Sequence, residues 1–124
     1  MRDHVLVSDG KNTVIVNQRS FCELIKWLLV EYLGVSYEAA SLRVEEKADF
    51  FASLDNVMSA ALESHNWPYY YTALDLYLGG HGPAQAEAGI LPSPNTPEGL
   101  DLYVDIERTI LIAHHLKEPI EWID

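Results

Sequence analysis

A chain of 124 residues is long enough to bury one hydrophobic core, and its 48% hydrophobic and 22% charged residues exclude a wholly disordered protein. Its 19 acidic and 8 basic residues give a net charge of −11, which argues against binding to nucleic acid or to an anionic membrane and favours a basic partner. No segment has the length and hydrophobicity of a signal-peptide core or a membrane span, so we expect a cytoplasmic protein.

Two short runs rich in β-branched residues begin the chain, at residues 4–8 and 13–17. The link between them, Asp9-Gly10-Lys11-Asn12, contains residues that tolerate the positive φ of a tight turn. The pattern predicts a β-hairpin. Because an isolated hairpin is only marginally stable in water, this one must pack on helices or recruit another strand.

The next segment has the pattern of an amphipathic helix over residues 21–33. Ser20 followed by Glu23 is typical of a capping box, and Gly34 is a helix stop. Cys22 lies on the apolar side of this helix, where we expect it to pack as a small hydrophobic side chain. Because it is the only cysteine, no intrachain disulfide can form. Trp27 and Val30 fall on the polar side, where they either pack against a second layer or form an exposed patch.

Residues 37–65 predict a second helical stretch, capped by Ser36, which is either one long helix or two helices joined near residues 45–47. A shorter helix is expected over residues 68–78, followed by a long glycine- and proline-rich loop at 79–99. Whether that loop is ordered is left open.

The segment at residues 100–116 fits two structures. Its apolar and polar residues alternate over 100–107 as in a strand, but Thr96-Pro97-Glu98 is a good helix start and no turn signal interrupts the next twenty or so residues. Length favours the helix, which would place Asp101, Asp105, Arg108 and His115 on one polar stripe. Glu118-Pro119 ends the element, and the last residues are expected to form an extended tail or an edge strand.

Together these elements predict an α+β fold: a mainly helical single domain spanning residues 1–124, with the N-terminal hairpin packed on three to five helices. The sequence indicates no catalytic site. Gly79-Gly80-His81-Gly82 lacks the spacing of a phosphate-binding loop, the histidines lack metal-ligand spacing, and no nucleophile motif is present. We therefore predict no metal and no cofactor, and we favour a binding protein over an enzyme.

Aromatic residues provide the strongest functional signal. Three consecutive tyrosines spread over an arc of about 200° on a helix, too wide for one buried face. Tyrosine and tryptophan are common at protein interfaces, and exposed carboxylates would attract a basic partner. The predicted partner-binding residues are Trp67, Tyr69, Tyr70, Tyr71, Asp75, Asp101 and Asp105.

This combination resembles, at the level of class only, immunity or antitoxin-type inhibitors that cover the active site of a basic nuclease toxin. In that hypothesis the three aspartates mimic substrate phosphates and the aromatic residues make the dry contact. The alternative is a small-molecule- or metal-binding enzyme domain, with a pocket between the Tyr-rich helix and the 79–99 loop that uses His81 and His114. A third alternative is a homo-oligomer that uses the aromatic patch on itself.

Overall fold

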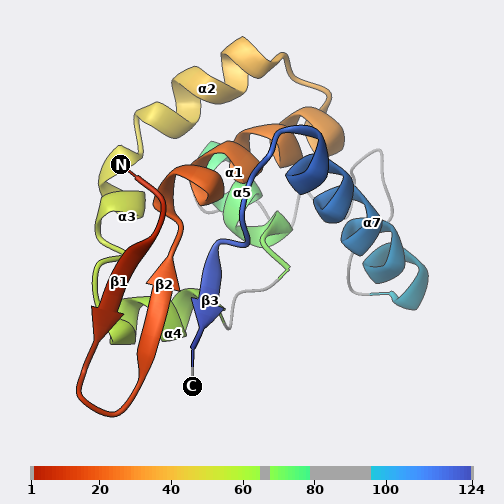
Figure 1. Cartoon of the computed structure of the whole chain (residues 1–124). Coiled ribbons are helices and arrows are strands. Elements are labelled where there is room, and N and C mark those ends of the chain that lie inside the picture. Colours follow the sequence, from red (N-terminus) through yellow and green to blue (C-terminus); the bar gives the residue numbers. More distant parts are fainter. Residues whose placement is uncertain (1, 65–67, 79–95, 124) are drawn as a thin grey trace.

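The computed structural model describes residues 2–64, 68–78 and 96–123 and confirms a mainly helical α+β fold. Helix α1 lies at the centre, with the sheet on one side and α7 on the other (Figure 1). The described elements are β1 (Val5–Ser8), β2 (Thr13–Val16), α1 (Gln18–Leu33), α2 (Tyr37–Glu45), α3 (Ala48–Ala52), α4 (Val57–Ser64), α5 (Tyr70–Leu78), α7 (Pro97–Ala113) and β3 (Ile120–Trp122).

The predicted hairpin is confirmed and gains a third strand from the other end of the chain. The strand order is β1-β2-β3, and both pairs are antiparallel, with Val14 opposite Val7 on one side and Trp122 on the other. In the turn, the Asp9 carboxylate accepts hydrogen bonds from the N–H groups of Lys11 and Asn12 at 2.9 and 2.8 Å. Of the two outcomes predicted for the C-terminal residues, the edge strand is therefore correct.

Helix α1 begins earlier than predicted, and the capping-box interpretation of Ser20 and Glu23 is wrong. The helix starts at Gln18, so Ser20 lies inside its first turn. The carboxylate of Asp3 takes the capping role from outside the helix, because it accepts hydrogen bonds from the Ser20 N–H at 2.7 Å and from the Ser20 hydroxyl at 2.6 Å. The predicted stop is confirmed, since Gly34 has a φ of 68° and donates to Val30.

The stretch after Ser36 divides into three helices. Ser36 caps α2 as predicted, and its hydroxyl accepts a hydrogen bond from the Ala39 N–H at 3.1 Å. The break between α2 and α3 falls at residues 46–47, where the two-helix alternative placed it. A second break, before α4, was not predicted; there Asn56 accepts a hydrogen bond from the Ser59 N–H at 2.8 Å and starts a new helix.

The ambiguous segment is helical over Pro97–Ala113, so length was the better guide than alternation. Thr96 caps α7, with its hydroxyl accepting a hydrogen bond from the Gly99 N–H at 3.0 Å. The helix ends in a Schellman motif: His115 has a φ of 54°, and Leu116 N–H donates to Leu111 C=O at 2.8 Å. His115 therefore leaves the polar stripe on which the helical prediction placed it.

The core forms around α1, which contacts α2, α3, α5 and α7. Leu24, Ile25, Leu28 and Leu29 are fully buried on this helix. Trp27 packs in a second layer, one of the two predicted alternatives, where its ring stacks on those of Tyr37 and His114 with centroids 4.5 and 4.2 Å apart.

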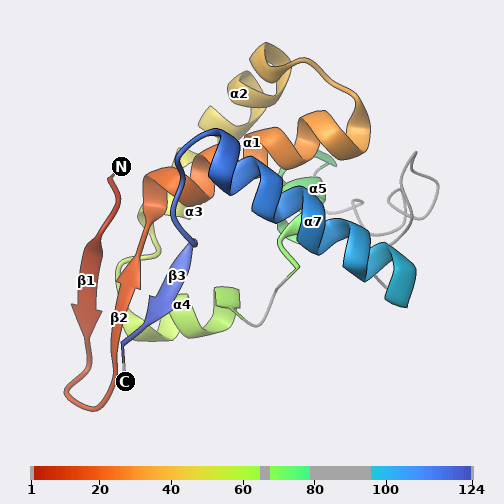
Figure 2. The ribbon, with the colours of Figure 1, turned by 45° about the vertical axis from the view of Figure 1, so that its right-hand side comes forward.

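Figure 2 shows α7 crossing close to α1. The strands are grouped on the side of the molecule away from the N-terminal end of α7. Among the helices of the described segments, none combines the length and the apolar composition needed to cross a bilayer.

Candidate functional site

Two of the predicted contact tyrosines belong to the core. Tyr69 and Tyr70 are 5% and 2% exposed. Their rings pack on α1, with centroids 4.8 Å from Phe21 and 4.3 Å from Tyr32 respectively. Tyr69 directly precedes α5, and Thr72, Ala73 and Leu74 on this helix are buried as well, so neighbouring elements cover the segment on more than one side. We therefore leave these two tyrosines out of the surface assigned to a partner.

The other aromatic candidates have different positions. Tyr71 is half-buried, with its ring 5.3 Å from that of Tyr70, and Asp75 one turn later on α5 is exposed. Trp67 lies outside the described residues, as does most of the 79–99 loop, including His81. The alternative pocket between that loop and α5 therefore falls outside the described residues as well.

Asp101 and Asp105 are solvent-exposed on α7, as the helical alternative predicted. Both are exposed and share one side of the helix with Arg108, Thr109 and Ile112, and Ile112 is 70% exposed. We call these five residues the α7 surface. The structure thus brings Asp101 and Asp105 together one helical turn apart, while Asp75 comes from a separate helix.

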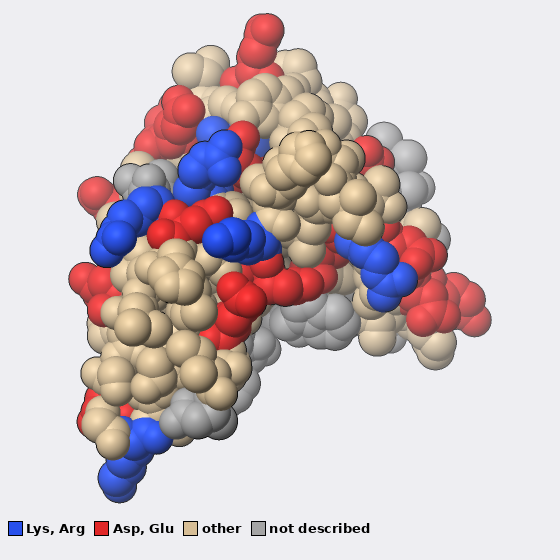
Figure 3. Space-filling view, in the orientation of Figure 1, with Lys and Arg blue, Asp and Glu red and all other residues tan. Residues whose placement is uncertain are grey.

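Pockets lie on both flanks of the α7 surface. Toward α1 there is a pocket of about 160 Å³ lined by Glu31, Asp105, Ile106, Thr109 and Ile110. On the opposite flank is a larger one of about 400 Å³, which we call the tail pocket, lined by Val104, Glu107, Arg108, Leu111, Ile112, Leu116 and Glu118. In the space-filling view, acidic side chains gather beside the hollow between the sheet and α7 (Figure 3).

Two buried glutamates near α5 were missed by sequence reasoning. Glu107, 7% exposed, accepts a hydrogen bond from the Tyr103 hydroxyl at 2.8 Å, and that hydroxyl accepts one from the Tyr69 N–H at 2.9 Å. Glu63, 5% exposed, accepts one from the Thr72 hydroxyl at 2.7 Å. The available signal for Glu107 was helical phase, since it falls on the side of α7 that carries the apolar residues.

These carboxylates affect the neighbouring phenols. Burial raises the pKa of Tyr103, and the charge and hydrogen bond of Glu107 raise it further. Burial also raises the pKa of Tyr69, with Glu107 and Glu63 adding to the effect. Both phenols therefore stay protonated at neutral pH, and Tyr103 serves as a hydrogen-bond donor to the buried carboxylate.

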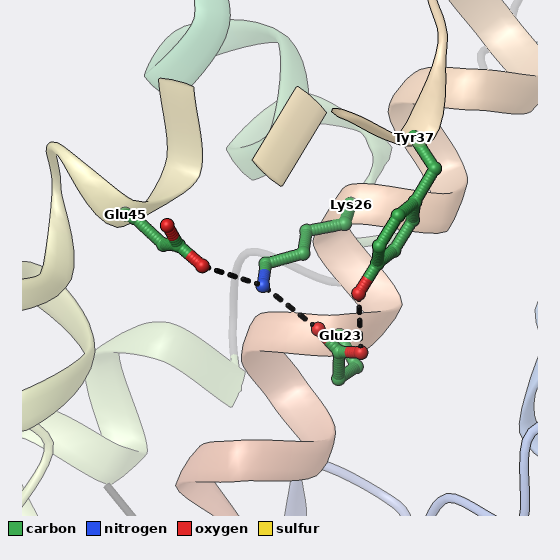
Figure 4. Close-up of polar contacts among 4 residues, drawn as sticks. All are labelled: Glu23, Lys26, Tyr37 and Glu45. Carbon is green, nitrogen blue, oxygen red and sulfur yellow. Dashed lines mark hydrogen bonds and ion pairs between the residues drawn. The ribbon is translucent and has the colours of Figure 1, made fainter. Parts of the chain in front are cut away.

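A separate polar cluster joins α1 to α2 (Figure 4). The ammonium of Lys26, a side chain only 9% exposed, lies 2.9 Å from a Glu23 carboxylate oxygen and 3.5 Å from Glu45, and the Tyr37 hydroxyl donates to Glu23 at 2.7 Å. Burial alone would lower the pKa of Lys26, but its hydrogen bond and ion pair with Glu23 leave that pKa raised. Glu23 therefore holds Lys26 in its charged form.

The same cluster borders a pocket of about 360 Å³ that Cys22 also lines. Cys22 is 5% exposed, as the prediction of a packed hydrophobic side chain requires, and burial raises the pKa of its thiol. A protonated thiol is a poor nucleophile. The ion pairs and hydrogen bonds beside this pocket hold α2 on α1.

Within residues 2–64, 68–78 and 96–123, no three or more His, Cys, Asp and Glu side chains are grouped so as to hold a metal ion. Comparisons with protein-family models, with curated proteins and with solved structures found no match to this chain.

Proposed function

We propose that this protein binds a basic protein partner through the α7 surface, in the manner of an immunity or antitoxin-type inhibitor that covers the active site of a nuclease toxin. The observation that supports the proposal best is the pairing of exposed Asp101 and Asp105 with the exposed side chain of Ile112 on one side of α7. Carboxylates at this spacing offer negative charge to a phosphate-binding site, and Ile112 offers an apolar contact beside it.

The charge of the whole chain supports the same proposal. A net charge of −11 attracts a positively charged protein from a distance and accelerates its association at low ionic strength. The two pockets beside the α7 surface provide recesses for side chains of the partner, and Glu31 adds a further carboxylate to one of them. In this proposal Ile112 and the pocket walls take the apolar role that the sequence assigned to Tyr69 and Tyr70.

The test uses the product of the neighbouring gene and two variants that lose the same amount of charge. Asp101→Asn combined with Asp105→Asn should slow association about tenfold at low salt, because both neutralised groups lie at the contact. The matched control, Glu38→Gln with Asp49→Asn, changes exposed residues on α2 and α3, away from α7, and should have little effect (Figure 1). Association rates are measured by surface plasmon resonance from 50 to 300 mM NaCl.

Three results would contradict the proposal: no association, association that is indifferent to salt, or equal losses in the two double variants. Light scattering of the protein alone separates the homo-oligomer alternative, because a stable dimer would appear without any partner.

A further inference from the structure

The tail pocket combines an apolar lining with carboxylate groups. Its volume of about 400 Å³ lies within the range of small-ligand pockets. Four of its lining residues, Val104, Leu111, Ile112 and Leu116, are aliphatic, and the others are Glu107, Arg108 and Glu118. The pocket therefore offers apolar contact and carboxylate groups in the same space.

The walls of the pocket are held in place by the fold. The Schellman motif fixes Leu116 beside Leu111, and the next residue, Lys117, donates its N–H to the Ser20 hydroxyl at 2.9 Å. The side-chain amide of Asn17 donates to the Glu118 carbonyl oxygen at 2.6 Å. The segment that closes the pocket is thus tied at successive residues to Ser20 in α1 and to Asn17 just before it, so little ordering entropy is lost when the pocket is filled.

The carboxylates lie at two depths. Glu107 is on the buried side of α7, while Glu118 is at the exposed edge. Partial burial raises the pKa of Glu118, and the charge of Glu121 raises it further. A cation placed between Glu107 and Glu118 would favour the charged form and oppose both effects. Arg108, the positive lining residue, is exposed at the solvent side of α7.

We infer that the tail pocket receives an arginine side chain of the basic partner, an assignment that rests on the proposed function. The aliphatic stem of the arginine would lie against Leu111 and Leu116, and its guanidinium would bind Glu107 and Glu118. Arginine suits the site better than lysine because its planar, weakly hydrated guanidinium pairs with carboxylates through two parallel hydrogen bonds.

The experiment titrates the full chain, labelled with ¹⁵N, with N-acetyl-arginine methylamide. Saturable changes in amide chemical shift are expected at Leu111, Ile112, Leu116 and Glu118. The lysine analogue should bind more weakly, and the norleucine analogue, which has the stem but no charge, more weakly still.

The variant Glu118→Gln should weaken arginine binding about fivefold, the loss expected for one exposed ion pair. The matched control is Glu98→Gln, an exposed glutamate in the first turn of the same helix, which should bind as the unaltered chain does. Because Glu118 is exposed, its substitution does not threaten folding. Glu107 is buried, so the folding of Glu107→Gln must be checked with a thermal melt.

Equal binding of norleucine and arginine, shifts outside the pocket, or no saturable shift would each overturn the inference. These failures are distinct from failure of the proposed function. If the partner binds through Asp101 and Asp105 but arginine leaves the pocket amides unchanged, the inference alone is wrong. If arginine binds as expected while the neighbouring gene product does not associate, the proposed function alone is wrong.

Discussion

Lys26 shows how a single residue can depart from its helical pattern. The sequence places it on the polar side of α1, yet only 7% of the residue is exposed because α2 covers it. A charge in such a position must be paired, and Glu23 and Glu45 supply the partners. The two glutamates differ in distance and exposure, so they are expected to contribute unequally.

At this scale we predict that Glu23→Gln lowers the free energy of unfolding by about 1.5–3 kcal/mol, because it removes a charged hydrogen bond to a buried ammonium. Glu45→Gln is the matched control. Its side chain is 63% exposed and lies 3.5 Å from Lys26, so the loss should be below about 1 kcal/mol. Urea unfolding at pH 7 measures both changes, and equal losses would contradict the assigned roles.

The contribution of Glu23 to the free energy of unfolding should also depend on pH. Burial would raise its pKa, but hydrogen bonds from Lys26 and Tyr37 lower it below the ordinary 4.5. A lowered pKa in the folded state gives stability that is fully present above pH 4.5 and lost as the pH falls through the folded-state value. The stability difference between the unaltered chain and Glu23→Gln should therefore shrink in acid, and a constant difference would show that the charge is not responsible.

At the scale of elements, the end of α7 is unusual because a Schellman motif is closed without glycine. His115 has a φ of 54°, a conformation that costs a residue with a Cβ atom about 1–2 kcal/mol. Gly34, by contrast, occupies the corresponding conformation at the end of α1. This explains why the sequence signals the end of α1 clearly and the end of α7 poorly.

We predict that His115→Gly raises the free energy of unfolding by up to about 1 kcal/mol, since relief of the left-handed strain exceeds the added flexibility of the unfolded chain. His114→Gly is the control. Residue 114 has a φ of −109° and its ring stacks on Trp27, so glycine there should destabilise the protein. Thermal melts decide the matter, and a loss of stability in His115→Gly would refute the strain argument.

At the scale of the whole molecule, the net charge of −11 opposes compaction while it favours a basic partner. Screening of this repulsion should raise the melting temperature as NaCl increases from about 10 to 200 mM, because the Debye length falls from about 30 Å to below 10 Å. The double variant Glu38→Gln with Asp49→Asn carries less repulsion and should respond less to salt. A melting temperature that falls over this range would contradict the prediction.

Local patterns alone were enough to predict several features. The hairpin turn at Asp9, the caps at Ser36 and Thr96 and the stop at Gly34 each depend on hydrogen bonds between residues at most four apart. Capping and turn residues are reliable signals at these positions, because donor and acceptor are close together in the chain whatever the rest of the fold does. The sequence likewise determined the α+β class and placed Asp101 and Asp105 one turn apart if their segment is helical.

Only the tertiary structure decided the features that depend on what covers a side chain. The cap of α1 comes from Asp3, 17 residues before Ser20, and the tail pocket needs the chain reversal at His115. The burial of both Tyr69 and Tyr70 likewise could not be predicted. Helical phase indicates the direction in which a residue points, but burial depends on how many neighbouring elements lie in that direction, and that number is settled only when the whole chain packs.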